Sequence, residues 1–331
     1  MVAAEQVRVP VEFAAWRRFA LDDALLLFDR DTGWNALCDG PETMGLRQLA
    51  PRALQFAITN VCNLACTFCS RDTTDASEWT VDSAFAFLRD LAAAGVLEVA
   101  FGGGEPFAFR GYDELVRRLR AETPLAVHAT TNGRLLDDRR LAAVRGQHGQ
   151  LRLSLYDDVD WRQQVRRLAA SGERFGVNLL LTPQRLQRME LLVCELVALG
   201  CGDVLLLRYK GHDASLHVDA AAAADLGPRV ASLARALRGR ASIKLDVCFG
   251  EWLAAAPRLF ARADCGAGRD FVVVTSDRRL SPCSFHEAKL PIACADDVLR
   301  LWQQQRAALA APARIVGCAR LPDHGLPAGA R

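Results

Sequence analysis

Short apolar stretches alternate with longer amphipathic ones from residue 53 onward. Six of the short stretches are rich in Val, Leu, Ile and Phe, which is typical of strands buried on both faces. These predicted strands cover residues 54–59, 97–101, 125–130, 151–156, 177–181 and 204–208. Helices are predicted between them near residues 81–94, 112–121, 135–145, 161–171 and 185–199. This rhythm predicts an α/β fold, a partial (β/α)6 TIM-like barrel, because a complete eight-stranded barrel typically takes about 250 residues.

The segment before the barrel has a weaker pattern. Residues 24–28 (ALLLF) indicate a short strand, Asp31-Thr32-Gly33 indicates a turn, and Trp34 begins a return strand. We therefore expect the N-terminal residues to form a small β-hairpin element that docks on the barrel. A partner-binding element is the alternative, although two strands alone are marginally stable.

The rhythm changes again after residue 215, where the predicted barrel ends. The elements expected there are an alanine-rich helix over 220–238, a strand at 243–247, a hairpin from 271–275 and 280–284, and a helix near 295–308. The division that we predict is a β-hairpin element in residues 1–52, a partial barrel in 53–215, a linker helix and C-terminal domain in 216–320, and a disordered tail in 321–331.

Composition excludes several classes of protein. The 331 residues carry 41 Lys and Arg against 39 Asp and Glu, a net charge of +2, so no bulk attraction to nucleic acid or anionic membranes is expected. No apolar run reaches the roughly 18 residues of a membrane-spanning helix. The first residues, MVAAEQVRVPVEF, do not form a secretory signal, because no basic stretch precedes an apolar core. We expect a cytoplasmic protein.

Eleven cysteines are a high count for a chain expected in a reducing compartment, so metal binding is favoured over disulfides. The strongest signal is the run Cys62-Asn-Leu-Ala-Cys66-Thr-Phe-Cys69, just after the first barrel strand. Barrel enzymes carry their chemistry at that end of the strands. Three thiolates on one loop can hold three corners of a cubane iron–sulfur cluster and leave one iron open. A zinc site or three structural cysteines are the alternatives, but no second Cys or His pair lies near in the sequence.

The second barrel strand ends in a glycine run, Gly102-Gly103-Gly104, followed by Glu105. Glycines let a backbone come close to a ligand where a side chain would clash. Glu105 can accept a charge-assisted hydrogen bond from an ammonium group. A merely flexible turn is the alternative.

Together these residues resemble the radical S-adenosylmethionine (SAM) enzymes over roughly residues 54–210. The C-x3-C-x2-C loop matches the family's cluster motif, and Gly103, Gly104 and Glu105 match its GGE motif, which binds the SAM amino group. Further matches are Asn132 in a TNG-type segment, Ser154 at a ribose or carboxylate contact, and Phe68, whose backbone faces adenine. The resemblance implies a [4Fe–4S] cluster held by Cys62, Cys66 and Cys69. It also implies reductive cleavage of SAM to a 5′-deoxyadenosyl radical that abstracts hydrogen from a substrate.

A second cysteine set follows the barrel. Cys265-Gly-Ala-Gly, a hairpin and Ser281-Pro282-Cys283 resemble the auxiliary-cluster domains called SPASM and, in the shorter form, Twitch. The one-cluster form fits better, because only Cys318 lies in the C-terminal region where full SPASM domains have many cysteines. The resemblance implies a second, auxiliary [4Fe–4S] cluster whose ligands are Cys248, Cys265, Cys283 and Cys318, with Cys294 as a substitute for the last. Buried apolar thiols are the alternative. The hairpin tip, Asp277-Arg278-Arg279, departs from the family's usual glycine.

Other polar residues are weaker candidates. Arg208, at the end of the sixth strand, can pair with the carboxylate of SAM or substrate, or be a solvated strand end. His286 and Glu287 can accept a proton near the second cysteine set. Cys38, Cys194 and Cys201 are expected to be core thiols.

The leading hypothesis is a radical SAM enzyme that oxidises or cross-links a ribosomally synthesised peptide. A small-molecule radical dehydrogenase or epimerase in antibiotic or cofactor biosynthesis shares all these motifs. A non-catalytic iron–sulfur electron carrier is the alternative of another class. The expected partners are a peptide or small-molecule substrate and an electron donor such as flavodoxin or ferredoxin.

Overall fold

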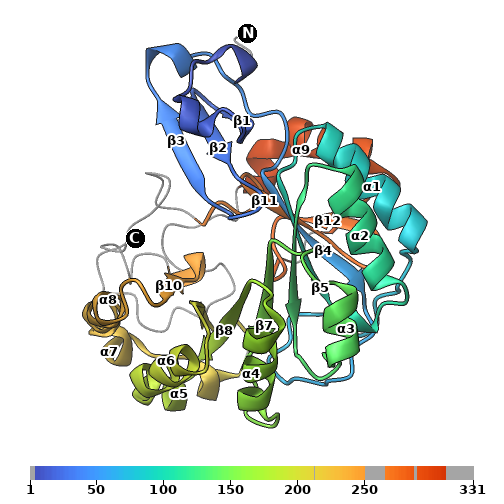
Figure 1. Cartoon of the computed structure of the whole chain (residues 1–331). Helices are drawn as coiled ribbons and strands as arrows, with labels where there is room; N and C mark the ends of the chain where they lie inside the picture. Colours follow the sequence, from blue (N-terminus) through green and yellow to red (C-terminus); the bar gives the residue numbers. More distant parts are fainter. Residues whose placement is uncertain (1–3, 212, 250–264, 287–288, 311–331) are drawn as a thin grey trace.

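The computed structural model describes residues 4–211, 213–249, 265–286 and 289–310. Its centre is a ten-stranded sheet in the order β10-β9-β8-β7-β6-β5-β4-β11-β12-β13 (Figure 1). The six predicted barrel strands are all present and pair in parallel, as β4 (Ala53–Thr59), β5 (Glu98–Gly103), β6 (Ala126–Thr131), β7 (Gln150–Ser154), β8 (Phe175–Leu181) and β9 (Asp203–Arg208). Among the strands that the structure describes, this order does not close into a ring, which confirms the partial TIM-like barrel.

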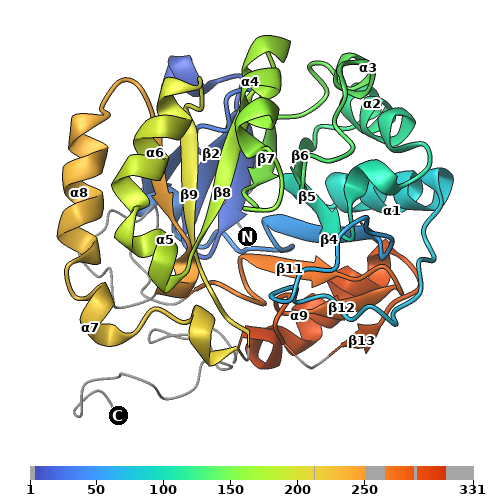
Figure 2. The ribbon, with the colours of Figure 1, turned by 90° about the horizontal axis from the view of Figure 1, so that it is seen from below.

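Helices cover the outer face of this curved sheet (Figure 2). They are α1 (Val81–Ala93), α2 (Tyr112–Glu122), α3 (Asp138–Ala143), α4 (Trp161–Ser171), α5 (Pro183–Gln187) and α6 (Met189–Ala198). Thr80 caps α1 by accepting a hydrogen bond from the Ser83 backbone N–H. The single helix predicted over 185–199 is wrong, because the backbone of Arg188 leaves the helical region and separates α5 from α6.

The N-terminal element has three strands where a hairpin was predicted. β1 (Arg17–Leu21), β2 (Ala24–Phe28) and β3 (Asn35–Asp39) form an antiparallel sheet. The missed strand, β1, begins with two arginines, so its apolar signal is short. Asp23 makes the tight β1–β2 turn with a positive φ of 61°.

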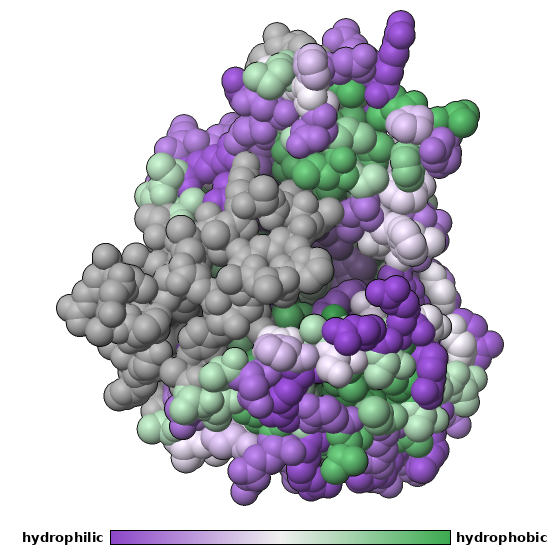
Figure 3. Space-filling model, turned by 90° about the vertical axis from the view of Figure 1, so that its left-hand side faces the viewer, coloured by the Kyte–Doolittle hydropathy of each residue, from purple (hydrophilic) through white to green (hydrophobic). Residues whose placement is uncertain are grey.

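This N-terminal sheet packs against the amino ends of the barrel strands. Phe19 and Phe28 pack with Leu97 and Ala126, and Arg17 donates a hydrogen bond to the Val96 carbonyl at 3.1 Å. The opposite face of the sheet carries a second, partly buried apolar cluster. Figure 3 shows apolar residues gathered on this upper part of the molecule.

The C-terminal segment extends both edges of the barrel sheet. β10 (Ser242–Leu245) pairs in parallel with β9, and β11 (Phe271–Val274) pairs in parallel with β4. β11 forms the predicted hairpin with β12 (Arg279–Ser281), and β13 (Leu290–Pro291) follows. Arg278 occupies the hairpin turn with a positive φ of 55°, where a glycine would be unstrained. Strands on both sides of the domain boundary predicted at residue 215 therefore belong to one continuous sheet.

The remaining helices are α7 (Ala220–Ala223), α8 (Leu226–Ala236) and α9 (Ala295–Ala310). One helix over 220–238 was predicted, but the non-helical backbone of Asp225 separates α7 from α8. Five short 3₁₀ helices also occur in the described residues, at Ala4–Gln6, Val11–Phe13, Pro41–Thr43, Pro106–Ala108 and Ala214–Leu216. Among the described helices, none has both the length and the apolar character to cross a membrane. Glu287, Cys318 and the tail 321–331 lie outside the described residues.

Candidate active site

The three cysteines of the first motif lie on the loop that leaves β4, at the carboxyl end of the sheet. Asn60 anchors this loop, because its side-chain amide donates to the carbonyls of Asp72 and Asp75 at 2.9 and 2.6 Å. Within the loop, the Cys69 N–H donates to the Cys66 carbonyl at 3.1 Å. Cys62 and Cys66 are half-buried and Cys69 is exposed. The loop is therefore fastened at both ends while its thiols stay accessible.

This donor set fits an iron–sulfur cluster. In the described part of the chain, no three Cys, His, Asp or Glu side chains already surround a position for a single metal ion. Residues 62–69 instead offer three thiols and no His, Asp or Glu side chain, and thiolates are the ligands that iron–sulfur clusters use. Cys62, Cys66 and Cys69 are the residues that would hold such a cluster.

Glu105 follows β5 and is buried beneath the cysteine loop, with 1% of its surface exposed. One carboxylate oxygen accepts from the Thr131 hydroxyl at 2.7 Å, and the other accepts from the Asn132 N–H at 2.8 Å. Burial raises the pKa of Glu105, and these neutral donors only partly oppose that rise. Because a carboxylate has about four acceptor positions, it retains capacity for a further donor.

Two of the glycines before Glu105 allow close packing of the chain on itself. The atoms nearest to Gly103 and Gly104 belong to residues 57–61, and the approach of a ligand to this backbone stays a prediction. A side chain on Gly104 would collide with the Val61 carbonyl, and one on Gly103, whose φ is +98°, with the Thr59 carbonyl. Gly102 has open space around it. The glycines therefore allow the Glu105 segment to pack against the base of the cysteine loop.

Asn132 connects the two segments. Its backbone N–H binds Glu105, and its side-chain amide donates to the Asn63 side chain at 2.7 Å. The same amide nitrogen lies 3.9 Å from the Cys62 sulfur. The structure thus brings Cys62, Glu105 and Asn132, which are far apart in the sequence, into one continuous set of contacts.

Three other predicted residues line a common pocket of about 200 Å³. These are Phe68 from the cysteine loop, Ser154 from β7 and Arg208 from the end of β9. The further residues in its wall were not predicted as site residues, and they include Tyr156, Asn178, Lys210 and Phe285. Asn178 lies on β8 and is paired with Ser154 on the neighbouring strand β7. A polar residue at this position of an otherwise apolar strand was a signal by which the sequence could have identified it.

Tyr156 joins the pocket to the cysteine loop. Its ring stacks on Phe68, with centroids 5.7 Å apart and planes 13° from parallel. Burial raises the pKa of the Cys66 thiol, and a hydrogen bond with Tyr156 acts in the opposite direction. Burial next to this sulfur also raises the pKa of Tyr156, so its hydroxyl is a neutral donor at ordinary pH.

The second cysteine set reaches the same pocket from the other side. Lys210 Nζ lies 3.2 Å from the Cys248 sulfur and 2.9 Å from Asp246 Oδ2. It also lies 4.6 Å from the ring centroid of Phe285, two residues after Cys283. Burial lowers the pKa of Lys210, but the negative charges of Asp246 and Cys248 more than offset this and raise it. The lysine is therefore a permanent cation between the pocket and Cys248.

The other cysteines differ in their surroundings. Cys265 is half-buried just before the β11 segment, and Cys294 is exposed at the start of α9. The core-thiol expectation is right for Cys201, which is buried, but wrong for Cys194, which is exposed. On α6 helical periodicity turns Cys194 outward, because the buried positions are Met189, Leu192, Val193, Leu196 and Val197. Cys38 is half-buried on β3.

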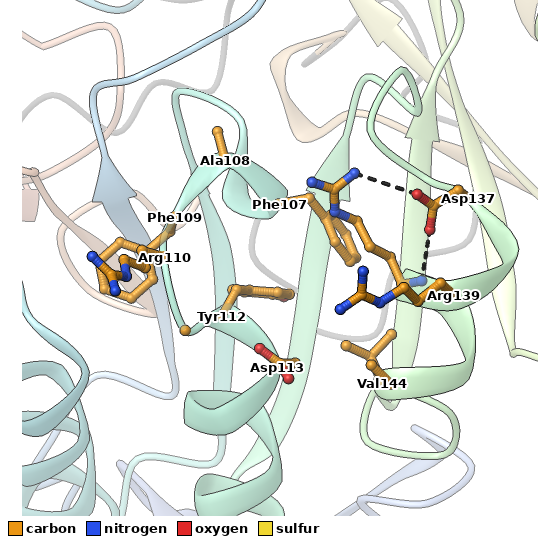
Figure 4. Close-up of a pocket in the computed structure, with 12 residues that line it drawn as sticks. Phe107, Ala108, Phe109, Arg110, Tyr112, Asp113, Asp137, Arg139 and Val144 are labelled. Atoms are coloured by element: carbon orange, nitrogen blue, oxygen red, sulfur yellow. Dashed lines mark hydrogen bonds and ion pairs between the residues drawn. The ribbon is translucent and has the colours of Figure 1, made fainter.

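A second cleft, of about 430 Å³, lies behind the Glu105 segment between α2 and α3. Figure 4 shows Phe107 and Tyr112 on one side and Asp137, Arg139 and Val144 on the other. The Tyr112 hydroxyl and His148 Nε2 are hydrogen-bonded at 2.9 Å, and burial lowers the pKa of His148 to about 3. None of the predicted site residues lines this cleft.

Comparison with known proteins gives a partial match to one family. Residues 56–179 match the model of the radical SAM superfamily. A probable GTP 3′,8-cyclase from Methanocella arvoryzae is 38% identical over 110 residues, which are 33% of this chain and 35% of that protein. The chain therefore matches only about a third of the length of this relative.

Two other matches cover more of the chain. A PqqA peptide cyclase from Gluconobacter oxydans is 27% identical over 271 residues, which are 72% of this chain and 71% of that protein. The crystal structure of Streptococcus suis SuiB bound to the precursor peptide SuiA aligns with a TM-score of 0.69. That alignment covers 86% of this chain and 88% of SuiB at 14% identity, so it shows a shared fold.

Proposed function

From the radical SAM domain that residues 56–179 form, we propose that this protein is a radical SAM enzyme that oxidises or cross-links a ribosomally synthesised peptide. A radical SAM domain implies a [4Fe–4S] cluster and SAM. The observation that carries the proposal is that both cysteine loops reach one pocket. Phe68, beside Cys69, and Phe285, beside the Cys283 segment, line the same cavity.

The roles proposed for the residues follow from their contacts. When bound, the cluster and SAM would supply a 5′-deoxyadenosyl radical able to remove a hydrogen atom from a substrate carbon. Cys62, Cys66 and Cys69 would hold the cluster, and the packing of Gly103 and Gly104 sets the position of their loop. Glu105 and Asn132 would bind the polar end of SAM, since they lie next to Cys62. Phe68, Ser154 and Arg208 would surround its remaining parts in the pocket.

The second cysteine set is proposed to hold an auxiliary cluster, with Cys248, Cys265 and Cys283 as ligands and Cys318 as the fourth. Support comes from Lys210, which contacts Cys248 and the ring of Phe285 and so draws two of these segments together. Cys248, Cys265 and Cys283 would hold the cluster, which would supply an acceptor for one electron from a substrate radical. The substrate would then lose one hydrogen atom and one electron in the pocket, and a proton would leave to a nearby base.

A peptide substrate is favoured over a small molecule by the extent of the matches. The stretch shared with the GTP 3′,8-cyclase covers only about a third of the chain, whereas the stretch shared with the PqqA peptide cyclase covers 72%. The longer stretch is more informative, because most of it lies outside the shorter one and it includes segments beyond the radical SAM domain. SuiB, which shares the fold, was solved with its precursor peptide.

Iron and sulfide content is the first test. After anaerobic reconstitution we expect about eight irons per chain, falling to about four in a Cys62/Cys66/Cys69→Ala variant. Cys194→Ala, at an exposed helix position, is the matched control and should retain all of them. A parent protein with about four irons that fall to none would remove the auxiliary cluster and favour a redox-neutral reaction.

The substrate class needs a separate assay. The reconstituted enzyme is incubated with SAM, dithionite and the short peptide encoded nearest to its gene, and 5′-deoxyadenosine and peptide mass are measured. We expect the peptide to lose two hydrogens in step with 5′-deoxyadenosine formation. SAM cleavage with an unchanged peptide would favour a small-molecule substrate, and no cleavage at all would favour an electron carrier.

The N-terminal sheet is proposed to bind part of the peptide. Its outer face carries partly buried apolar residues that include Val9, Phe13 and Trp16. Deleting residues 1–52 would also uncover Leu97 and Ala126, so a milder change is preferable. Phe13→Ser with Trp16→Ser should weaken peptide binding and leave the melting temperature within a few degrees. Unchanged peptide affinity would exclude this role.

A further inference from the structure

Lys210 is unusually placed among the lysines that the structure describes. Its side chain is only 13% exposed, and it bonds both to a carboxylate, Asp246, and to a sulfur, Cys248. A buried cation is costly unless its partners compensate it. Asp246 alone would supply that compensation, so the additional contact with sulfur calls for a chemical explanation.

The fold holds this contact in place from both sides. Lys210 follows β9, and Asp246 and Cys248 follow β10, its parallel neighbour, so the three residues leave the same end of the sheet. The Cys248 N–H donates to Asp246 Oδ1 at 3.1 Å, and Arg208 donates to the Cys248 carbonyl at 3.2 Å. The sulfur of Cys248 therefore has little freedom to move away from the ammonium group.

Lys210 also lines the pocket of about 200 Å³ that contains Phe68 and Ser154. It lines the cavity together with Arg208 and Phe285, and its ammonium group lies over the face of the Phe285 ring. The ammonium group already contacts a carboxylate, a sulfur and an aromatic ring of the chain itself.

We propose that Lys210 is a positioning residue whose N–H···S hydrogen bond to Cys248 raises the reduction potential of the auxiliary cluster. The inference rests on the proposed function, in which Cys248 is a ligand of that cluster. A hydrogen bond and a positive charge at a ligand sulfur stabilise the more negative, reduced state of a cluster. Lys210 thereby makes electron transfer from a substrate radical to the cluster more favourable.

A matched control exists in the same sheet. Lys244 on β10 forms an ion pair with Asp203 on β9 at 2.6 Å, so it joins the same two strands. No contact between Lys244 and a cysteine occurs among the residues that the structure describes. If Lys210 only ties β9 to β10, both lysines should behave alike in a redox measurement.

The test is a redox titration of the auxiliary cluster alone, followed by EPR and visible absorption. All variants carry Cys62/Cys66/Cys69→Ala, so that only the second cluster is present. Lys210→Met removes the donor and the charge, Lys210→Gln keeps a neutral donor, and Lys210→Arg keeps both. We expect Lys210→Met to shift the equilibrium between oxidised and reduced cluster at least tenfold toward the oxidised state. For one electron this lowers the reduction potential by about 59 mV. Lys210→Gln should fall between, and Lys210→Arg and Lys244→Met should match the parent.

Each other result has a defined meaning. In the first, the Cys62/Cys66/Cys69→Ala protein holds about four irons while Lys210→Met and Lys210→Gln leave its reduction potential unchanged. That result overturns the role of Lys210 but keeps the auxiliary cluster. An equal shift in Lys244→Met overturns it as well, since the effect would then be one of general charge. A parent background with no iron removes the auxiliary cluster, and both proposals fail together. Because Lys210→Gln keeps a polar side chain, it serves as the test if Lys210→Met does not fold.

Discussion

The two ends of strand β5 carry glutamates with opposite properties. Glu98, the first residue of β5, forms an ion pair with Arg52 and lies 3.2 Å from Nε2 of His128. Burial alone would raise the pKa of Glu98, but the hydrogen bond with His128 and the charge of Arg52 lower it to about 2. Glu105, just after the strand, has only neutral donors, and burial raises its pKa.

A second ion pair lies toward the amino ends of the strands, where Asp203 of β9 binds Arg152 at 2.6 Å, and the N-terminal sheet covers part of that end. At the carboxyl ends, the thiols of the cysteine loop and the carboxylate of Glu105 have bonding capacity left over. A completed ion pair stabilises a fold, whereas an incompletely satisfied group can bind a ligand, which is why barrel enzymes separate the two.

The largest effect is expected at the carboxyl end, in Cys66→Ala. Loss of one of three thiolates should abolish 5′-deoxyadenosine formation, because a cluster with two protein ligands is not held. The measurement is chromatography of the products after incubation with SAM and dithionite. Cys194→Ala, which removes an exposed thiol far from the loop, should retain full activity. Persistent 5′-deoxyadenosine in Cys66→Ala would contradict the radical SAM assignment of this loop.

The next effect concerns the base of the cysteine loop. Gly104→Ala places a methyl group against the Val61 carbonyl and should displace the loop, lowering the iron retained on the Cys62 motif severalfold. Gly102→Ala, two residues earlier, adds the same methyl group in open space and should retain all of the iron. Iron analysis of both variants after reconstitution gives the comparison. Equal iron in the two would show that the close packing at Gly104 is unimportant.

A smaller effect is expected from Glu105→Gln. Removing the charge should weaken SAM binding by roughly tenfold to a hundredfold, because hydrogen bonds to a charged group contribute about 1.5–3 kcal/mol. Calorimetric titration of the reconstituted protein with SAM measures this. Glu98→Gln, the same substitution at the other end of β5, should leave SAM affinity unchanged. If Glu98→Gln weakens SAM binding equally, the two ends are not functionally distinct.

The smallest effect on function, and the clearest effect on stability, is expected from Glu98. Because the folded pKa of about 2 lies below the ordinary value of 4.5, ionised Glu98 stabilises the fold above pH 4.5. That stabilisation is lost as the pH falls from 4.5 through 2. Glu98→Gln should lower the free energy of unfolding by about 2–3 kcal/mol at pH 7 and flatten its dependence on acid pH. Denaturant unfolding at several pH values measures both, and identical acid profiles for parent and variant would refute the ion-pair account.

The sequence by itself determined the barrel strands and the cysteine motif. The strand β8 is apolar except for Asn178 and is buried along nearly all of its length, as expected for a strand that is covered on both faces. Cys62, Cys66 and Cys69 are close in the chain, so their placement on one loop follows from spacing alone. The strand β1 and the breaks at Arg188 and Asp225 were missed, because one or two residues decide them and local patterns average over more.

Only the tertiary structure decided which distant residues meet. Lys210 and Cys248 are brought together because β9 and β10 are parallel neighbours, and β11 joins the sheet beside β4 although more than two hundred residues separate them. The pairing also turned Gly103 and Gly104 toward the chain's own backbone, and gave Glu98 and Glu105 opposite pKa shifts at the two ends of one strand. Such contacts depend on sheet order and on burial, and these arise from the packing of the whole chain, so no short stretch of sequence contains them.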